Sequence, residues 1–196
     1  MQNDISVVIA GNAPAEVLKK VLWGYNTQTY RNFEMLIVGD AKVPDELKAE
    51  LFFPVINVSN HNNGTVIDLA MPACGTGYMV VADAHAIPRH DFVEQHVKYR
   101  EEGYYLTGSV TDIPLKQFEG ITREDIYSGK CFSRPGNGNK SGLIGSIMNR
   151  LVPPDADWNS YNASGWKEDL CGNGPRSKDV KPRQIKYSTV CLRAKK

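Results

Sequence analysis

Short apolar runs alternate with stretches of helical periodicity through the first half of the chain. The apolar runs predict strands at residues 5–10, 33–38, 54–58, 78–82 and 104–110. Apolar residues three and four positions apart predict helices at residues 15–25, 44–51, 65–71 and 91–100. Strands that alternate with helices form mostly parallel sheets with helices on both faces. The pattern therefore predicts an α/β fold built on such a sheet.

The second half of the chain is less regular. Residues 132–140 are rich in Gly, Asn and Pro and predict a loop, and residues 141–151 resemble a short amphipathic helix. Another helix is expected from Gly165 to Leu170, because Glu168 and Asp169 would lie in a first turn where the helix dipole favours acids. No repeat or linker interrupts the 196 residues, and this length is typical of one domain.

Composition narrows the class of protein. Hydrophobic residues make up 41% and charged residues 23%, as in folded globular proteins, and a net charge of +1 does not indicate a nucleic-acid partner. The four cysteines form no C-x-x-C pair, which argues against a zinc ribbon and fits reduced thiols. No apolar run approaches the roughly 18 residues of a membrane span, and no signal region opens the sequence. We expect a soluble, cytoplasmic protein without an integral membrane segment.

Candidate chemistry is concentrated where predicted strands end. Asp83 and His85 follow the strand at residues 78–82, and residues two apart in an extended chain project the same way. A carboxylate and an imidazole that converge there can bind a divalent metal. The alternative is a solvated turn after a core strand. Gly11 and Asp40 follow two other strands, and ligands of such sheets lie beyond the carboxyl ends of the strands.

Seven landmarks, in chain order, resemble those of family-2 glycosyltransferases, which have the GT-A fold. They are the strand at 5–9, N-T-Q-T-Y-R-N-F-E at 26–34, L-I-V-G-D at 36–40, N-N-G at 62–64, D-A-H-A-I-P at 83–88 with Asp91, Phe92 and His96, L-T-G at 106–108, and W-K-E-D at 166–169. The resemblance covers nearly the whole chain. It implies a single minimal, Rossmann-like GT-A domain, with a nucleotide-sugar-binding half at residues 1–103 and an acceptor and catalytic half at 104–196.

The resemblance also implies an activity. We expect a metal-dependent, inverting hexosyltransferase that moves a hexose from a UDP-sugar, such as UDP-glucose or a UDP-N-acetylhexosamine, to the hydroxyl of a saccharide or other acceptor. His85 and Asp83 would hold the metal, with Asp83 also near the donor ribose. An imidazole ligand favours Mn²⁺ over Mg²⁺.

Further donor-site roles follow from the resemblance. Asp40 would contact the nucleotide base, or else cap the helix that begins near Pro44. Gly11 would allow close approach of the backbone to the base, or else be an ordinary turn glycine. Asn63 has the weakest claim, because Asn-Asn-Gly forms turns in any protein. Arg193 or Lys181 would close over the diphosphate.

The residues that the resemblance assigns to the acceptor belong to the W-K-E-D motif at 166–169. Asp169 would be the base that takes the acceptor's proton, with Glu168 in second place, and both could instead complement a helix dipole. Trp166 would form a platform for the acceptor sugar, or else be buried. His96 is read as structural, because it shares a helix with the apolar Phe92.

Departures from the family pattern motivate an alternative function. Gly39 replaces an expected Asp, His85 stands at the second Asp of D-x-D, no A-R-N follows Gly64, and no histidine follows His96. The alternative is a catalytically reduced module that binds a nucleotide sugar or glycan without turnover. The absence of Q-x-x-R-W argues against a processive synthase.

Overall fold

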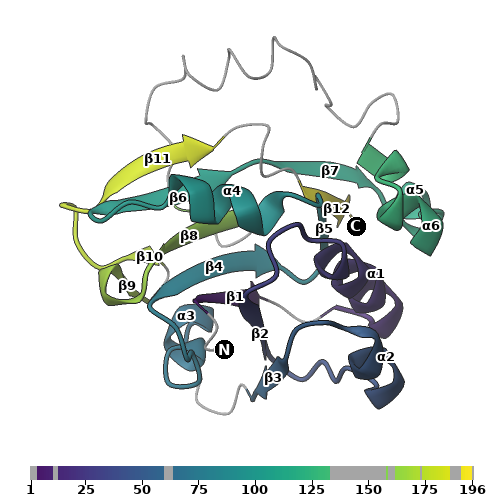
Figure 1. The fold of residues 1–196 in the computed structure, drawn as a ribbon, viewed down its shortest axis with the longest axis horizontal. Coiled ribbons are helices and arrows are strands. Elements are labelled where there is room, and N and C mark those ends of the chain that lie inside the picture. Colours follow the sequence, from purple (N-terminus) through teal and green to yellow (C-terminus); the bar gives the residue numbers. More distant parts are fainter. Residues whose placement is uncertain are drawn as a thin grey trace, which may run out of the picture.

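The computed structural model of the protein describes residues 4–10, 13–59, 64–132, 158, 162–172, 174–185 and 191–195 (Figure 1). The first part of the chain forms the predicted alternation. Its elements are β1 (Ile5–Ala10), α1 (Ala15–Asn26), β2 (Phe33–Val38), α2 (Asp45–Glu50), β3 (Val55–Val58), α3 (Val66–Ala70), β4 (Tyr78–Asp83), β5 (Ala86–Pro88) and α4 (Phe92–Tyr99). The strands and helices predicted for this part are confirmed.

The later part of the chain adds strands more than helices. Its elements are β6 (Tyr104–Gly108), β7 (Val110–Pro114), α5 (Leu115–Glu119), α6 (Arg123–Tyr127), the short 3₁₀ turn η1 (Lys130–Phe132), β8 (Asn162–Trp166), the 3₁₀ turn η2 (Lys167–Asp169), β9 (Leu170–Cys171), β10 (Gly174–Pro175), β11 (Lys181–Ile185) and β12 (Cys191–Lys195). The helix predicted at 141–151 and most of the loop at 132–140 lie outside the described residues.

A seven-stranded sheet has the order β11-β6-β8-β4-β1-β2-β3. The pairs of β1 with β2 and β4, of β2 with β3 and of β6 with β11 are parallel, and only the two pairs made by β8 are antiparallel. The predicted mostly parallel α/β sheet is therefore confirmed. Strands from residues 104–196 extend the same sheet that residues 1–103 begin.

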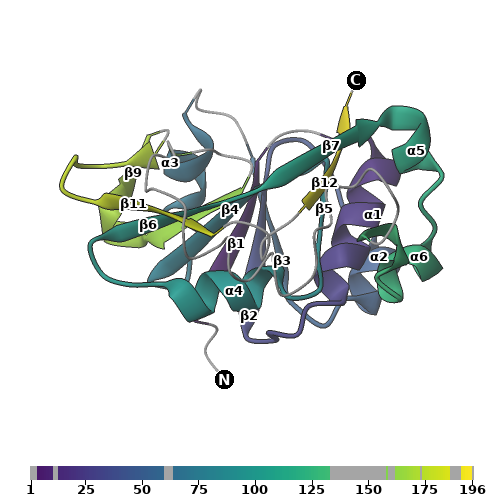
Figure 2. The ribbon, with the colours of Figure 1, turned by 90° about the horizontal axis from the view of Figure 1, so that it is seen from above.

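Alternate residues of the central strands face two different layers. Ile5, Val7 and Ile9 pack with α1 and α4 in one apolar cluster, whereas Val8 packs with α3 in another. This period of two is what a strand with both faces covered requires. Figures 1 and 2 show α1, α2 and α4 on the side of the sheet away from α3.

The helix expected from Gly165 to Leu170 is wrong. Residues 162–166 form β8, which lies between β4 and β6, and Lys167–Asp169 make a single 3₁₀ turn. Ser and Gly are poor helix formers, and in β8 the positions Ala163, Ser164 and Gly165 are buried in the sheet. Tertiary packing thus decides the structure of this segment, and its acids do not begin an α-helix.

A second, smaller sheet lies beyond the end of β4. Its order is β5-β12-β7, with β12 antiparallel to β5 and parallel to β7. The backbone N–H of Ala194 in β12 also donates to the carbonyl of His85, at 3.2 Å. Strand β12 therefore holds the later side of the turn that follows β4, at His85 and β5. Within the described part of the chain, no helix has the length and apolar character needed to cross a bilayer.

Candidate functional site

The carboxyl ends of β4, β1 and β2 lie side by side at one edge of the large sheet. The three strands are parallel neighbours (Figure 1). Asp83 at the end of β4 and Gly39-Asp40 after β2 therefore lie at the same edge. Two other predicted donor-site residues, Gly11 and Asn63, lie outside the described residues. We call the carboxyl ends of β4, β1 and β2 the donor edge.

Asp83 and His85 contact each other directly. The Nδ1 atom of His85 lies 2.9 Å from Asp83 Oδ1, and this oxygen also accepts the backbone N–H of His85 at 2.8 Å. The side chains are 11% and 22% exposed, so both border solvent from a largely enclosed turn. The predicted convergence of the two side chains is confirmed.

Two residues from the small sheet add charge beside this pair. Arg193 in β12 donates from Nε and Nη2 to both carboxylate oxygens of Asp112 in β7, at 2.6 and 3.0 Å. Its Nη1 atom also lies 3.8 Å from Asp83 Oδ2. Arg193 therefore lies at the donor edge. Asp112, which the sequence motifs did not single out, holds the guanidinium there.

The donor set of this turn fits a divalent ion that arrives with substrate phosphates. With Nδ1 turned to Asp83, the Nε2 atom of His85 is the nitrogen available to a metal, and a carboxylate behind a metal-binding imidazole is the usual arrangement. Among the described residues no third His, Cys, Asp or Glu joins the pair. Ions that bind with nucleotides take further ligands from phosphates and water.

A cavity opens next to Asp40, at the ends of β2 and β3. It has a volume of about 560 Å³, and Lys42, Pro44, Lys48 and Asn57 contribute to its lining. Gly39 adopts a φ of 130°, a backbone conformation that favours glycine and turns the chain into this lining. Pro44 takes the N-cap position of α2, so Asp40 is not the cap residue of that helix.

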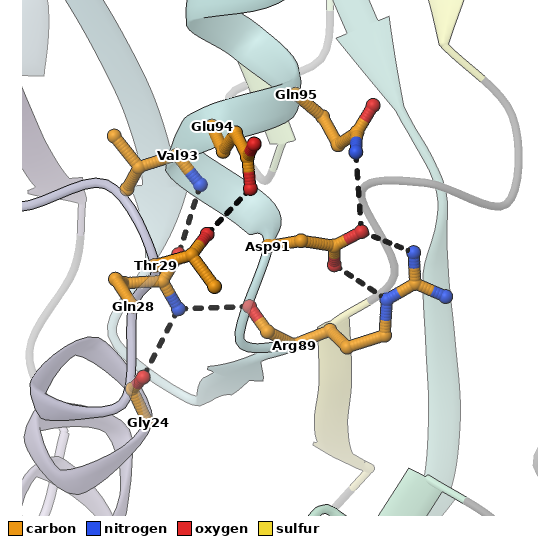
Figure 3. Close-up of polar contacts among 8 residues, drawn as sticks. All are labelled: Gly24, Gln28, Thr29, Arg89, Asp91, Val93, Glu94 and Gln95. Carbon is orange, nitrogen blue, oxygen red and sulfur yellow. Dashed lines mark hydrogen bonds and ion pairs between the residues drawn. The ribbon is translucent and has the colours of Figure 1, made fainter.

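A buried glutamine fixes the segment that follows the Asp83–His85 turn. The side-chain amide of Gln28 donates to the carbonyls of Gly24 and Arg89, at 3.0 and 2.8 Å, and its oxygen accepts the N–H of Val93 at 2.9 Å (Figure 3). Beside it, Asp91 accepts two hydrogen bonds from Arg89, at 2.6 and 2.7 Å. Gln28 belongs to the N-T-Q-T-Y motif, so that motif has a positioning role that sequence reasoning missed.

Trp166, Glu168 and Asp169 do not lie at the donor edge. Strand β8 runs antiparallel to β4, so Trp166 pairs with Tyr78 at the amino end of β4, and Lys167 N–H donates to the carbonyl of Gly77. Asp83 is five positions further along β4, or about 16 Å at ~3.3 Å per residue. The structure therefore does not bring the predicted base to Asp83 and His85.

His96 is fully buried, and its structural role is confirmed. Its Nδ1 lies 2.7 Å from Ser164 Oγ and its Nε2 lies 3.0 Å from Asn162 Oδ1. The amide oxygen can only accept, so Nε2 carries the proton and Nδ1 accepts from the serine hydroxyl. Burial disfavours the charged ring and lowers the pKa of His96 to about 4.

Comparison with known proteins identifies the family. The sequence profile of glycosyl transferase family 2 matches residues 6–158, which include Asp40 and the Asp83–His85 turn. The chain belongs to glycosyl transferase family 2. No curated protein matches the sequence of this glycosyltransferase-family chain.

Solved structures share the fold of this family-2 chain at low identity. A mannosyltransferase from Pyrobaculum calidifontis, in complex with GDP-Man and Mn²⁺, matches with 15% identity and a TM-score of 0.55, over 99% of this chain and 57% of that one. A mycobacterial protein matches with 10% identity and a TM-score of 0.54, over 99% of this chain and 68% of that one. The fold is the GT-A fold of glycosyltransferases. The chain spans little more than half the length of the mannosyltransferase.

Proposed function

We propose that this family-2 glycosyltransferase moves a hexosyl group from a UDP-sugar to an acceptor hydroxyl, with inversion, at the donor edge. One observation carries the proposal. The Asp83–His85 turn and the cavity beside Asp40 lie on one edge of the sheet with only β1 between their strands. Two strand spacings amount to about 10 Å, a separation that a nucleoside diphosphate can bridge.

In the proposed complex the nucleobase occupies the cavity beside Asp40. The carboxylate of Asp40 accepts the N–H of uracil, while Gly39 leaves room for the backbone to turn away from the base. The ribose and diphosphate then run across the end of β1 toward Asp83. Gly11 and Asn63 stay proposed donor-binding residues on the family resemblance alone, because both lie outside the described residues.

The diphosphate is the leaving group, and its departure builds negative charge next to His85 and Arg193. His85 through Nε2, and Asp83 directly or through water, would hold a divalent ion, with Mn²⁺ preferred over Mg²⁺ because of the imidazole. Such an ion stabilises the charge as a Lewis acid, by several kcal/mol. Arg193 adds a fixed positive charge 3.8 Å from Asp83, and Asp112 keeps its guanidinium in place.

A binding module without turnover is the second candidate. Inverting transfer requires a base beside the acceptor hydroxyl, and Glu168 and Asp169 lie at the opposite end of β4. This placement favours a protein that holds the nucleotide sugar at the donor edge without transferring its sugar.

Release of nucleoside diphosphate, measured with and without Mn²⁺, separates the two functions. We expect UDP-glucose or UDP-N-acetylglucosamine to be turned over, and GDP-mannose serves as the contrasting donor. His85→Ala should lower metal-dependent release at least a hundredfold, because it removes the proposed metal ligand. His90→Ala is the matched control, since His90 is exposed and should leave the rate unchanged.

One result would decide against transfer, and another against the assignment of His85. Donor binding without release of any diphosphate, across all three donors and several saccharide acceptors, would favour the binding module. Equal rates for His85→Ala and the wild-type protein across a Mn²⁺ titration would remove His85 from the metal site.

A further inference from the structure

A second cavity lies at the amino end of β4, on the edge opposite the donor edge. It has a volume of about 360 Å³, in the lower part of the roughly 300–1,000 Å³ range of small-molecule sites. Asp4, Gly75, Gly77, Tyr78, Arg100 and Trp166 contribute to its lining. We call this cavity the amino-edge pocket. None of these residues lies at the donor edge, and the proposed transfer reaction uses none of them.

The Trp166 ring and the Arg100 guanidinium form one wall of the pocket, and the fully buried Tyr78 ring packs against Trp166. The rings of Tyr78 and Trp166 meet edge to face at 5.1 Å between centroids, and the Arg100 guanidinium lies 6.0 and 5.9 Å from them. The indole Nε1 of Trp166 is buried and has no hydrogen-bond partner among the described residues. Because that atom is covered, Trp166 offers the pocket its ring and not its N–H.

Polar groups in the pocket are only partly satisfied by the protein. The Arg100 guanidinium makes no hydrogen bond within the described part of the chain, and Asp4 Oδ2 lies 3.6 Å from its Nη1. The other oxygen of Asp4 accepts from Tyr30 and Asn32. The pocket therefore presents guanidinium donors and a carboxylate acceptor side by side, at 30% and 40% side-chain exposure.

The floor of the pocket is rigid. Glu34 is buried and accepts from Ser6 Oγ at 2.6 Å and from the N–H of Gly75 at 2.7 Å. Ser6 also contacts Thr76, at 2.8 Å. These bonds hold residues 75–77 against the amino ends of β1 and β2. The site is thus preformed, and a ligand would lose little affinity to ordering the protein.

We propose that the amino-edge pocket binds a neutral saccharide. The lining carries one acidic and one basic side chain, so its charges cancel and do not favour a phosphate. A pyranose ring has an apolar face for the aromatic wall and hydroxyls that both donate and accept, which match Asp4 and Arg100. The binding is independent of the transfer reaction, because the two edges are separated by the length of β4.

Gly77 provides a way to close the pocket without disturbing the fold. A Cβ atom built there meets nothing within 4 Å, and its φ is not positive, so a larger side chain fills space without strain. Gly77→Leu should fill the pocket, and Arg100→Ala should remove its main donors. Arg183→Ala is the matched control, since Arg183 also stacks on an aromatic ring, Tyr104, and pairs with an acid, Glu101.

The test is ligand-observed NMR titration of the whole chain with maltotriose, cellotriose, mannotriose and triacetylchitotriose. At least one trisaccharide should bind with a Kd on the order of 1 mM. Arg100→Ala should weaken this binding at least tenfold, Gly77→Leu should abolish it, and Arg183→Ala should stay within twofold of the wild-type Kd. Thermal unfolding checks that each variant is folded, and if Gly77→Leu is not, Arg100→Ala against Arg183→Ala decides.

Several outcomes would overturn the proposal. They are no binding of any trisaccharide, unchanged binding by folded Gly77→Leu or Arg100→Ala, displacement by inorganic phosphate, or competition with UDP, which would place the sugar at the donor edge. A wild-type protein without transferase activity that still shows the expected variant pattern would reject the proposed function and support the amino-edge pocket.

Discussion

At the scale of single residues, His85 and His96 differ in whether a ring nitrogen is available to a ligand. His85 lies in a solvent-bordered turn with Asp83 at Nδ1, which leaves its other nitrogen for a ligand. His96 has both nitrogens engaged inside the protein, by Ser164 and Asn162. The polar chain continues from Ser164 to the hydroxyl of Tyr78 and from Asn162 to the carbonyl of Ser109. A proton on Nδ1 of His96 would force the Ser164 hydroxyl to donate to Tyr78 instead of to the ring.

The stability of the fold should depend on pH through His96. Burial lowers the folded-state pKa of His96 to about 4 from its ordinary value of 6.5, so the unfolded chain takes up a proton first as pH falls. The contribution of neutral His96 to stability is therefore complete above pH 6.5 and is lost as pH falls toward 4. The loss is on the order of 3 kcal/mol. Urea unfolding at several pH values measures it.

NMR of the histidine ring provides the control for this prediction. The Cε1–H signal of His96 should stay unshifted down to about pH 5, because burial keeps its ring neutral there. A His96 signal that titrates near pH 6.5 in the folded protein would contradict the buried neutral ring.

At the scale of elements, the donor edge depends on how closely β5 approaches α1. A Cβ atom at Gly24 in α1 would lie 2.7 Å from Pro88 Cδ and 3.0 Å from Ile87 Cγ2. Gln28, one turn later, bonds to the backbone on either side of this contact (Figure 3). Helix α1 thus sets the position of β5, and β5 follows the Asp83–His85 turn directly.

Gly24→Ala tests this packing, because helix propensity and the contact with β5 should change the stability of the protein in opposite directions. Helix propensity alone would stabilise the variant by up to about 1 kcal/mol. The contact with the proline ring should outweigh this gain and destabilise the protein by about 1–3 kcal/mol. Urea unfolding should show the loss, together with weaker donor binding because β5 moves. Gly77→Ala, which meets open space, is the matched control, and a Gly24→Ala variant more stable than wild type would refute the close approach.

At the scale of the whole molecule, the sequence predicts the sheet better than it predicts the two edges. Periodicity located the strands and helices up to residue 108 except β5, and the contact of Asp83 with His85 was expected from their spacing two positions apart at the end of β4. The pairing of Arg193 with Asp112 depends on β12 joining β7, which local patterns do not encode. Likewise, the W-K-E-D motif is visible in the sequence, but the edge of the large sheet at which it lies depends on the direction of β8. An antiparallel strand sends the motif to the far end of β4.

The direction of β8 predicts the behaviour of two acid variants. Asp169→Asn and Glu168→Gln should leave kcat within about twofold of the wild-type value, since both follow Trp166, which pairs with Tyr78 about 16 Å from Asp83 along β4. Steady-state release of nucleoside diphosphate measures this, with Asp83→Asn as the variant that should fail. A hundredfold loss of kcat in Asp169→Asn with unchanged donor affinity would mean that residues 167–169 reach the donor edge during turnover.

The strand order of the small sheet has a consequence for protein synthesis. Strand β12 pairs with β5 across about a hundred positions of sequence, and it supplies the N–H that fixes the carbonyl of His85. At roughly 5–20 residues per second, a ribosome needs on the order of ten seconds to make the intervening chain. During that interval the nascent protein has Asp83 and His85 but lacks the strand that braces them. The donor edge is therefore completed late in translation, after the first strands of the large sheet have been made.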